Sequence, residues 1–381
     1  MAPEIAGRLL VDGRLQPGRV ELEGDRIRRV TLDAGARGGD ELPLVAPGLI
    51  DLHVHGFGGC DPYGDLAGMA NALAGAGTTA FLPTLFPRRS AAALGGEADE
   101  VWRTAQSRAG GARALGVHLE GPFVNPGAVG GLPADELAEP SPEALAELLG
   151  PATGDGRGIR AITLAPELPG AREMIAELAR CGVRASLGHS LATVAETSGG
   201  VQAGATGATH LFNAMRPLHH REAGIAGVAL TADELCPEII GDLVHVGREA
   251  FELALRARGA DGLCLISDSL KGPGADGHSF CSHGKTCVVE DGSAWFDDET
   301  AEGGRRLTGT VLGQLDAVRR LVSRGVLGVE EALTMASASP ARELGLEGEL
   351  GTLAAGARAD LLVLRGPELA LAEVWVGGRR I

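Results

Sequence analysis

The chain has 381 residues, a hydrophobic fraction of 44% and a formal net charge of −16, from 34 Lys and Arg against 50 Asp and Glu. A chain of this length can build one large domain and a small one. Its acidity argues against a nucleic-acid backbone or an anionic membrane as the main partner. The charged N-terminus and the absence of a long apolar run predict no signal peptide and no membrane span, so we expect a cytoplasmic protein.

Both ends of the chain predict short strands joined by tight turns. Strands are expected near the N-terminus over residues 8–11, 19–22 and 26–30, and near the C-terminus over residues 351–353, 359–364 and 374–379. The two ends share this character and the middle differs from both. We therefore expect a small β domain from residues 1–46 and 350–381, and a second domain from residues 47–349.

The middle of the chain alternates short apolar runs with helical stretches. A helix is expected over residues 141–149 with Ser141 as its N-cap. Strands are expected over residues 45–50, 80–82, 114–117, 159–164, 183–187, 238–240 and 263–266. This alternation indicates a (β/α)8 barrel or a doubly wound sheet, and the lack of a G-x-G-x-x-G motif after the first strand favours the barrel.

Two histidines, His53 and His55, follow directly after the first of these strands. Alternate residues of a strand face the same side, so both imidazoles can bind one divalent cation. Asp268 lies 215 residues after His53, about seven βα units of roughly 31 residues. The two residues would then follow the first and eighth strands, which are neighbours in a closed barrel and distant in an open sheet.

Other His and carboxylate residues also come just after predicted strands: Glu120, His189, His210, Asp242, His245 and Asp268. In a (β/α)8 barrel these strand ends meet at the C-terminal face, where active sites are built. Imidazoles and carboxylates with an open position make a catalytic metal site. The pattern therefore favours metal-assisted hydrolysis, with Asp268 suited to carry the proton between water and leaving group.

The chain closely resembles the N-acetylglucosamine-6-phosphate deacetylases of the amidohydrolase superfamily, almost from end to end. The resemblance is carried by H-L-E-G-P at residues 118–122, G-H-S at 188–190 and T-H-L-F-N-A-M at 209–215, with A-P-G-L-I-D at 46–51 and G-T-L-A-A-G at 351–356. The first three motifs in this order are highly specific, whereas the D-x-H-x-H stretch at 51–55 marks only the superfamily. The resemblance implies a (β/α)8 barrel with a small β-sandwich from both termini.

The resemblance also implies one or two divalent metals per subunit. Glu120, His189 and His210 would bind the principal ion. His53 and His55 would offer a second site with Glu120 as a bridge, and some family members work with one metal only. Zinc is the first expectation, although iron, manganese and cobalt suit the same ligands.

Further roles follow from the same resemblance. Asp268 matches the general acid/base. Arg221 matches the arginine that binds the sugar phosphate from the partner subunit, which implies a homodimer; its planar fork suits a phosphate. The substrate itself would contact Gly131, Asn213, Ala214, Asp242, His245, Leu307, Thr308 and Gly309.

Three departures from the family pattern leave the exact substrate open. Leu132 stands where a His is usual, Leu243 replaces a Gly, and Lys271 lies in a turn that is usually apolar. The first hypothesis is deacetylation of N-acetylglucosamine 6-phosphate. The alternative is another amide, such as N-acetylgalactosamine 6-phosphate or a non-phosphorylated N-acetyl sugar. A non-catalytic scaffold would be expected to have lost metal ligands, whereas all of the predicted ligands are present in this sequence.

Overall fold

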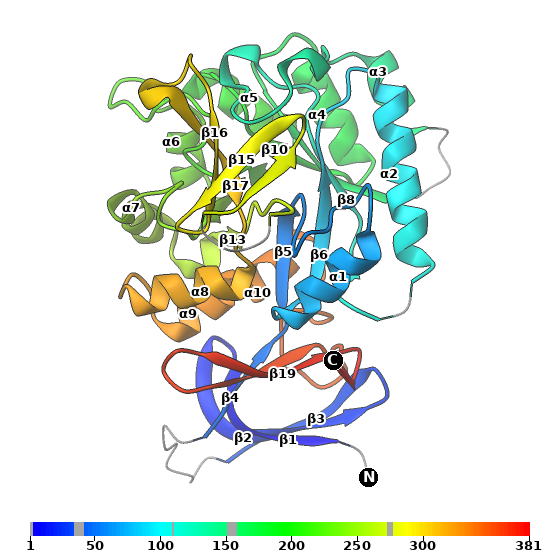
Figure 1. Cartoon of the computed structure of the whole chain (residues 1–381), viewed down its shortest axis with the longest axis vertical. Coiled ribbons are helices and arrows are strands. Elements are labelled where there is room, and N and C mark those ends of the chain that lie inside the picture. Colours follow the sequence, from blue (N-terminus) through cyan, green and yellow to red (C-terminus); the bar gives the residue numbers. More distant parts are fainter. Residues whose placement is uncertain (1–2, 34–41, 109, 151–157, 273–276) are drawn as a thin grey trace.

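The structure is a computed structural model that describes residues 3–33, 42–108, 110–150, 158–272 and 277–381. Three sheets organise the chain: a parallel barrel in the middle, an antiparallel sheet inserted at its open end, and a sheet that gathers both termini (Figure 1). The predicted (β/α)8 barrel with a small β-sandwich is confirmed.

Eight parallel strands form the barrel, each paired with the next in chain order. They are β5 (Leu49–Val54), β6 (Thr78–Leu85), β8 (Val117–Glu120), β9 (Ile159–Leu164), β10 (Arg184–Leu187), β11 (Gly207–Ala208), β12 (Cys236–Ile240) and β13 (Cys264–Ile266), with the short β7 (Arg113–Ala114) beside β6. The first and eighth strands meet through hydrogen bonds from Asp268 N to His53 O (3.0 Å) and from His55 N to Ser269 O (2.8 Å). The predicted proximity of His53 and Asp268 is therefore confirmed.

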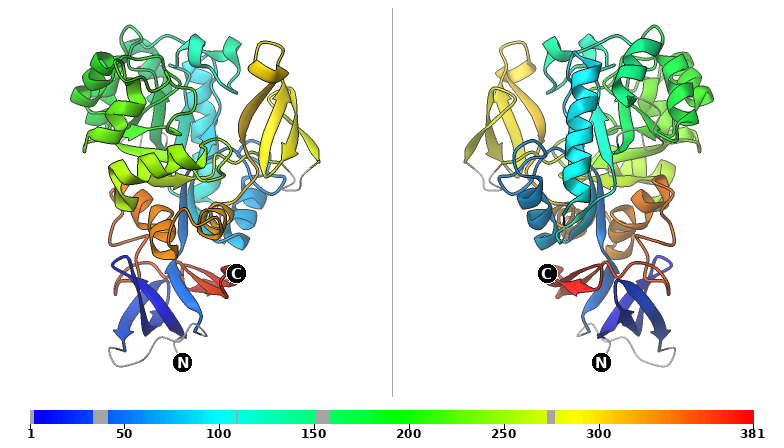
Figure 2. Two further views of the ribbon diagram at one scale, coloured as in Figure 1. Left: turned by 90° about the vertical axis from the view of Figure 1, so that its left-hand side faces the viewer. Right: turned by 90° about the vertical axis from the view of Figure 1, so that its right-hand side faces the viewer.

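Helices cover the outside of the barrel (Figure 2). The α-helices are α1 (Leu66–Gly75), α2 (Ala91–Gln106), α3 (Pro142–Leu149), α4 (Ala171–Arg180), α5 (Val194–Ala203), α6 (Gly224–Thr231), α7 (Arg248–Arg258), α8 (Gln314–Ser323), α9 (Val329–Met335) and α10 (Ala338–Glu343). Ser141 caps α3 as predicted, accepting a hydrogen bond from Ala144 N. None of the helices in the described part of the chain combines the length and apolarity needed to cross a bilayer.

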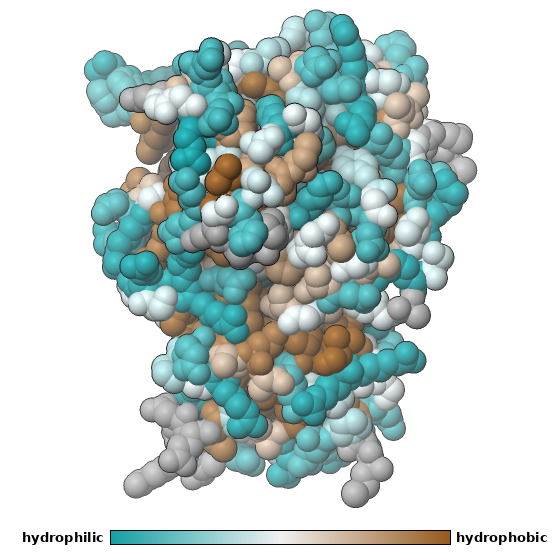
Figure 3. All heavy atoms as spheres, in the orientation of Figure 1, coloured by the Kyte–Doolittle hydropathy of each residue, from teal (hydrophilic) through white to brown (hydrophobic). Residues whose placement is uncertain are grey.

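The terminal sheet has the strand order β20-β19-β18-β4-β1-β2-β3. Its strands are β1 (Glu4–Val11), β2 (Arg14–Glu23), β3 (Arg26–Leu32), β4 (Leu44–Pro47), β18 (Leu361–Arg365), β19 (Ala370–Val376) and β20 (Arg379–Arg380). Its core contains apolar side chains from both ends of the chain, such as Leu9, Val20 and Leu361. Val374 of β19 packs instead into the main core of the barrel, and Figure 3 shows apolar residues gathered where sheet and barrel meet.

Three strand predictions are wrong in detail. The run 114–117 contains the last residue of β7 and the first residue of β8, with a break between them. The apolar run 45–50 is two strands, β4 and β5, which belong to different sheets and separate at Gly48. A side chain at Gly48 would meet Thr79 Oγ1 of β6 at 2.0 Å, so the chain changes sheets where only glycine fits. Residues 351–353 form no strand, although Leu353 is buried in the core of the terminal sheet. The division into residues 1–46 with 350–381 and 47–349 stays a proposal.

The inserted sheet was not predicted. It comprises β14 (Ser279–Ser282), β15 (Lys285–Glu290), β16 (Ser293–Asp297) and β17 (Arg305–Thr310), all antiparallel. Its inner face forms an apolar cluster with loops of the barrel, through Phe296 and Cys287 on the sheet and Phe86, Val124 and Leu132 on the loops. This cluster holds β17 beside the C-terminal ends of the barrel strands.

Candidate active site

The predicted chemical groups come together at the C-terminal ends of the barrel strands. Glu120 Oε1 lies 3.0 Å from both His189 Nε2 and His210 Nε2, and these two nitrogens are 3.1 Å apart. All three residues are buried. Burial alone would raise the pKa of the Glu120 carboxyl, but the imidazoles of His53 and His189 lower that pKa well below its usual value. Glu120 is therefore held as a carboxylate.

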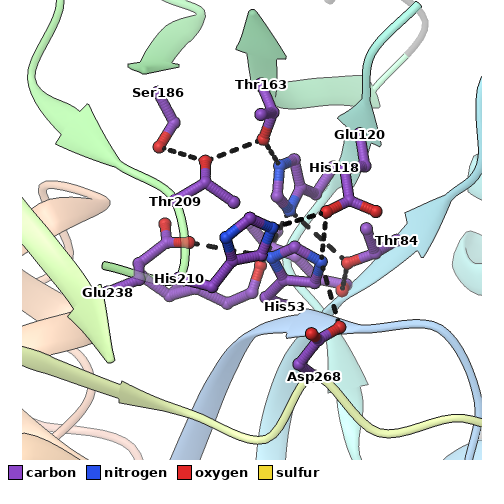
Figure 4. Close-up of polar contacts among 12 residues, drawn as sticks. His53, Thr84, His118, Glu120, Thr163, Ser186, Thr209, His210, Glu238 and Asp268 are labelled. Atoms are coloured by element: carbon purple, nitrogen blue, oxygen red, sulfur yellow. Dashed lines mark hydrogen bonds and ion pairs between the residues drawn. The ribbon is translucent and has the colours of Figure 1, made fainter. Parts of the chain in front are cut away.

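A second group shares the same carboxylate. His53 Nε2 and His55 Nε2 are 3.1 Å apart, and His55 Nε2 lies 3.1 Å from Glu120 Oε2. His53 Nε2 lies 3.4 Å from Glu120 Oε1. Figure 4 shows the side chains of His53, His210, Glu120 and Asp268 turned toward a common point. Glu120 is thus placed to bridge two sites.

The donor atoms fit divalent metal ions. Nδ1 of His189 lies 2.9 Å from Ala128 O, and Nδ1 of His55 lies 3.2 Å from Thr84 O. A carbonyl oxygen can only accept, so each Nδ1 carries the proton and each Nε2 presents its lone pair. Lone pairs that converge with a carboxylate in two groups of three match the ligand chemistry of a metal centre.

Three of the predicted metal-binding and acid/base residues occupy the left-handed backbone region. The φ angles are +48° at His189, +31° at His210 and +48° at Asp268. Residues other than glycine adopt this conformation rarely, and such strain gathers at functional sites. Each of these residues lies just after a strand, where the turn directs its side chain across the barrel opening.

Asp268 lies at the boundary between the imidazoles and the solvent. Its Oδ1 is 3.5 Å from His53 Nε2 and 3.6 Å from His55 Nε2, and its side chain is 13% exposed. Its backbone is fixed on both sides, because its N–H donates to His53 O and its carbonyl accepts from Thr310 N at 2.9 Å. The carboxylate can therefore exchange a proton with water or substrate above the imidazoles.

A cavity of about 690 Å³ opens over these groups. Seven of the predicted substrate contacts line it: Gly131, Asn213, Ala214, His245, Leu307, Thr308 and Gly309. A side chain at Gly131 would meet Thr308 Oγ1 at 2.2 Å, so the loop before Leu132 packs directly on β17. A larger cavity of about 1000 Å³ lies beside α3 and α4, and none of the predicted site residues lines it.

Asp242 lies beneath the cavity and holds His245. Its Oδ2 accepts from His245 Nδ1 at 2.6 Å and from Ser293 Oγ at 2.7 Å. Burial would raise the pKa of Asp242, but the hydrogen bond from His245 and the other donors lower it to about 2. Leu243, where a glycine is usual in the family, adopts φ +58°. Asp242 therefore positions His245 and does not itself reach the cavity.

Arg221 lies on an exposed loop, where its Nη1 is 2.9 Å from His220 Nε2. It does not line the cavity of its own chain. Two other arginines do, Arg305 and Arg306 of β17, and they pair with Glu290 (3.1 Å) and Asp298 (2.6 Å) respectively. The sequence reasoning missed them, although they directly precede the predicted contact Leu307.

The other two departures from the family pattern lie apart from the imidazoles. Leu132 is 3% exposed within the apolar cluster beneath the inserted sheet. Lys271 Nζ pairs with Asp61 Oδ2 at 2.7 Å. Phe86, which the sequence reasoning did not select, stacks on His55 with the ring centroids 3.9 Å apart. It covers one face of a predicted ligand.

Comparisons with known proteins agree with this geometry. The chain matches the model of the Amidohydrolase family over residues 44–381. It is 31% identical to the N-acetylglucosamine-6-phosphate deacetylase of Lysinibacillus sphaericus, over 92% of this chain and 90% of that protein. It is 33% identical to an N-acetylgalactosamine-6-phosphate deacetylase of Escherichia coli, over 89% and 88% respectively.

A solved structure is similar over the whole chain. It is a mutant of N-acetyl-D-glucosamine-6-phosphate deacetylase from Mycobacterium smegmatis in complex with N-acetyl-D-glucosamine-6-phosphate, with a TM-score of 0.87, 29% identity and coverage of 100% of this chain and 99% of that one. Fold, motifs and matched length agree, and the resemblance seen in the sequence is confirmed: the chain belongs to the amidohydrolase family.

Proposed function

We propose that this chain hydrolyses the N-acetyl group of N-acetylglucosamine 6-phosphate to give glucosamine 6-phosphate and acetate. One observation carries the proposal: Glu120 lies between two pairs of imidazoles at the floor of a cavity, with Asp268 beside them. The similarity to a deacetylase named for this substrate, over nine-tenths of the chain, supports the choice of sugar.

The residues present define the chemistry. Glu120, His189 and His210 would hold the principal metal ion. When bound, the ion polarises the amide carbonyl and lowers the pKa of a water to about 7. Asp268 takes a proton from the attacking water and returns it to the leaving nitrogen, as the water oxygen bonds to the carbonyl carbon and the carbon–nitrogen bond breaks. His245, held by Asp242, contacts the sugar.

The metal and the compartment are part of the proposal. Amidohydrolases are metal-dependent, and both donor groups suit zinc, with iron, manganese and cobalt as competitors for the same ligands. We propose that His53 and His55 hold a second ion together with Glu120. All six cysteines are free thiols, which supports a reducing cytoplasm.

We propose that the phosphate is bound across a homodimer by Arg221 of the partner subunit. Arg221 is exposed and lies outside the cavity of its own chain, while a chain of net charge −16 offers an anion little general attraction. Arg305 and Arg306 are the competing anchors within one chain, but each already faces a carboxylate.

The substrate panel is the direct test of the function. We expect acetate release to be fastest with N-acetylglucosamine 6-phosphate among phosphorylated and free N-acetylglucosamine and N-acetylgalactosamine. N-acetylgalactosamine 6-phosphate must be included because one relative of this chain is named as a deacetylase of that sugar. A preference for that sugar or for the free sugars would replace the proposed substrate, and no release from any of them would reject deacetylation of these sugars.

The principal metal ligands should be non-redundant. We expect Glu120→Ala, His189→Ala and His210→Ala each to lose bound metal and activity together, because two remaining donors are too few for a stable site. Metal content by inductively coupled plasma mass spectrometry and acetate release measure both properties. The exposed His278→Ala is the matched control and should keep both. Full metal content with near-normal turnover in any ligand variant would contradict the assignment.

Asp268→Asn should keep metal and substrate binding but lose turnover. Asn is nearly isosteric and cannot take the proton from water, so kcat should fall on the order of 10²-fold or more with a similar KM. Steady-state kinetics and metal analysis of the same preparation separate the two effects. The acid/base role of Asp268 is rejected by a kcat within a few-fold of wild type.

Arg221→Ala should lower kcat/KM for the 6-phosphate substrate by about ten- to a hundredfold, because a charge-assisted contact contributes roughly 1.5–3 kcal/mol. Activity on the free N-acetyl sugar should barely change. Arg306→Ala is the matched comparison, and a phosphate-selective loss in that variant alone would place the anchor within one chain.

The dimer has its own test with the same variant. Mixed dimers of Arg221→Ala with Asp268→Asn should recover activity, because one hybrid site then has both groups intact. The absence of recovery in mixed dimers verified by mass would show that each site is complete within one subunit.

A further inference from the structure

Two buried polar atoms from different strands face each other in the barrel interior. Nδ1 of His53 and Oε2 of Glu238 are 3.8 Å apart, and neither has a hydrogen-bond partner among the described residues. Both side chains are fully buried. Glu238 lies on β12, and the sequence reasoning gave it no role. An unpartnered carboxylate oxygen at this depth is costly, which calls for a physical reason.

The orientation of Glu238 is set by an arginine on its other side. Arg184 Nη1 of β10 donates to Glu238 Oε1 at 2.5 Å. The guanidinium is itself held by Cys236 O at 3.3 Å and by Glu343 Oε2 at 3.6 Å. Arg184 compensates the charge of the carboxylate and leaves its second oxygen directed at His53.

The partner of Nδ1 distinguishes His53 from the predicted ligands His55 and His189. His55 and His189 donate from Nδ1 to backbone carbonyls, whereas His53 is the one metal-ligand histidine in the described part of the chain with its Nδ1 within 4.0 Å of a carboxylate. The neighbouring His118 does not compete for Glu238, because its Nε2 bonds Thr163 Oγ1 at 2.8 Å and its Nδ1 faces Leu52 O at 3.2 Å (Figure 4).

We propose that Glu238 is the positioning residue for the second metal site. It accepts the Nδ1–H of His53, after closing about 1 Å to hydrogen-bond length, and so keeps the lone pair of Nε2 directed at the position shared with His55 and Glu120. A carboxylate partner also makes the imidazole a stronger donor than a carbonyl partner does. This inference rests on the proposed two-metal function and names the residue that makes the second site competent.

The test compares metal retention in wild type, Glu238→Gln and Ser186→Ala. Ser186 is equally buried in the barrel. Its hydroxyl accepts a hydrogen bond from Thr209 Oγ1 and, among the described residues, is not hydrogen-bonded to His53 or Glu238. Zinc-loaded proteins are dialysed against buffers of decreasing free Zn²⁺, and the retained metal is measured by mass spectrometry. We expect Glu238→Gln to weaken the second zinc about 10- to 100-fold and to leave the first unchanged. Ser186→Ala should match wild type at both sites.

Each outcome decides the inference. Equal retention of both ions by Glu238→Gln and wild type overturns the role of Glu238 and leaves the two-metal proposal intact. A wild type that retains one zinc at every concentration rejects the two-metal proposal and this inference with it, while deacetylation is still judged by the substrate panel. If circular dichroism shows that Glu238→Gln does not fold, Glu238→Asp takes its place. It keeps the charge opposite Arg184, withdraws the oxygen from His53 and should weaken the same site.

Discussion

The closure of the barrel between its first and last strands is the constraint on which the site depends. The backbone hydrogen bonds that join His53 O to Asp268 N and Ser269 O to His55 N place residues from opposite ends of the barrel segment side by side. Without closure, Asp268 would lie across an open sheet from the imidazoles that it faces. The positions of the proposed acid/base, of the proposed second metal site and of the shared Glu120 are therefore consequences of one ring of parallel strands.

This arrangement places charged side chains in the interior of the barrel. Glu120 and Glu238 are buried carboxylates, and Asp51, also fully buried, has its pKa raised by burial to about 6. Burial would likewise raise the pKa of Glu238, but Arg184 and His53 lower it to about 2. The anions of Glu120 and Glu238 are thus each stabilised by specific neighbours, and removal of one partner would leave an uncompensated charge in the core.

Periodicity and spacing predicted most of the architecture, and the failures have local causes. The strand at 159–164 and the Ser141 cap follow from residue patterns that burial and capping produce directly. The strand β11 has two residues, too few for any pattern, and the run 45–50 hides a change of sheet at Gly48. The left-handed backbone conformations of His189 and Asp268 could not be predicted from the amino-acid composition around them. The surroundings of Arg221 in the proposed dimer depend on a second subunit, so no residue pattern within one chain could predict them.

The site divides into two parts with different sequence requirements. The chemical groups lie at the ends of the barrel strands or in the turns that directly follow them. The cavity walls come from loops and from the inserted sheet, where Leu132 packs with β15 and β16 in an apolar cluster and β17 lines the cavity. A substitution at Leu132 in that cluster would alter the wall of the cavity, away from the imidazoles. Relatives named for glucosamine and for galactosamine phosphates are similar to this chain at nearly equal identity, as expected when the reaction is set by the strands and the sugar by the walls.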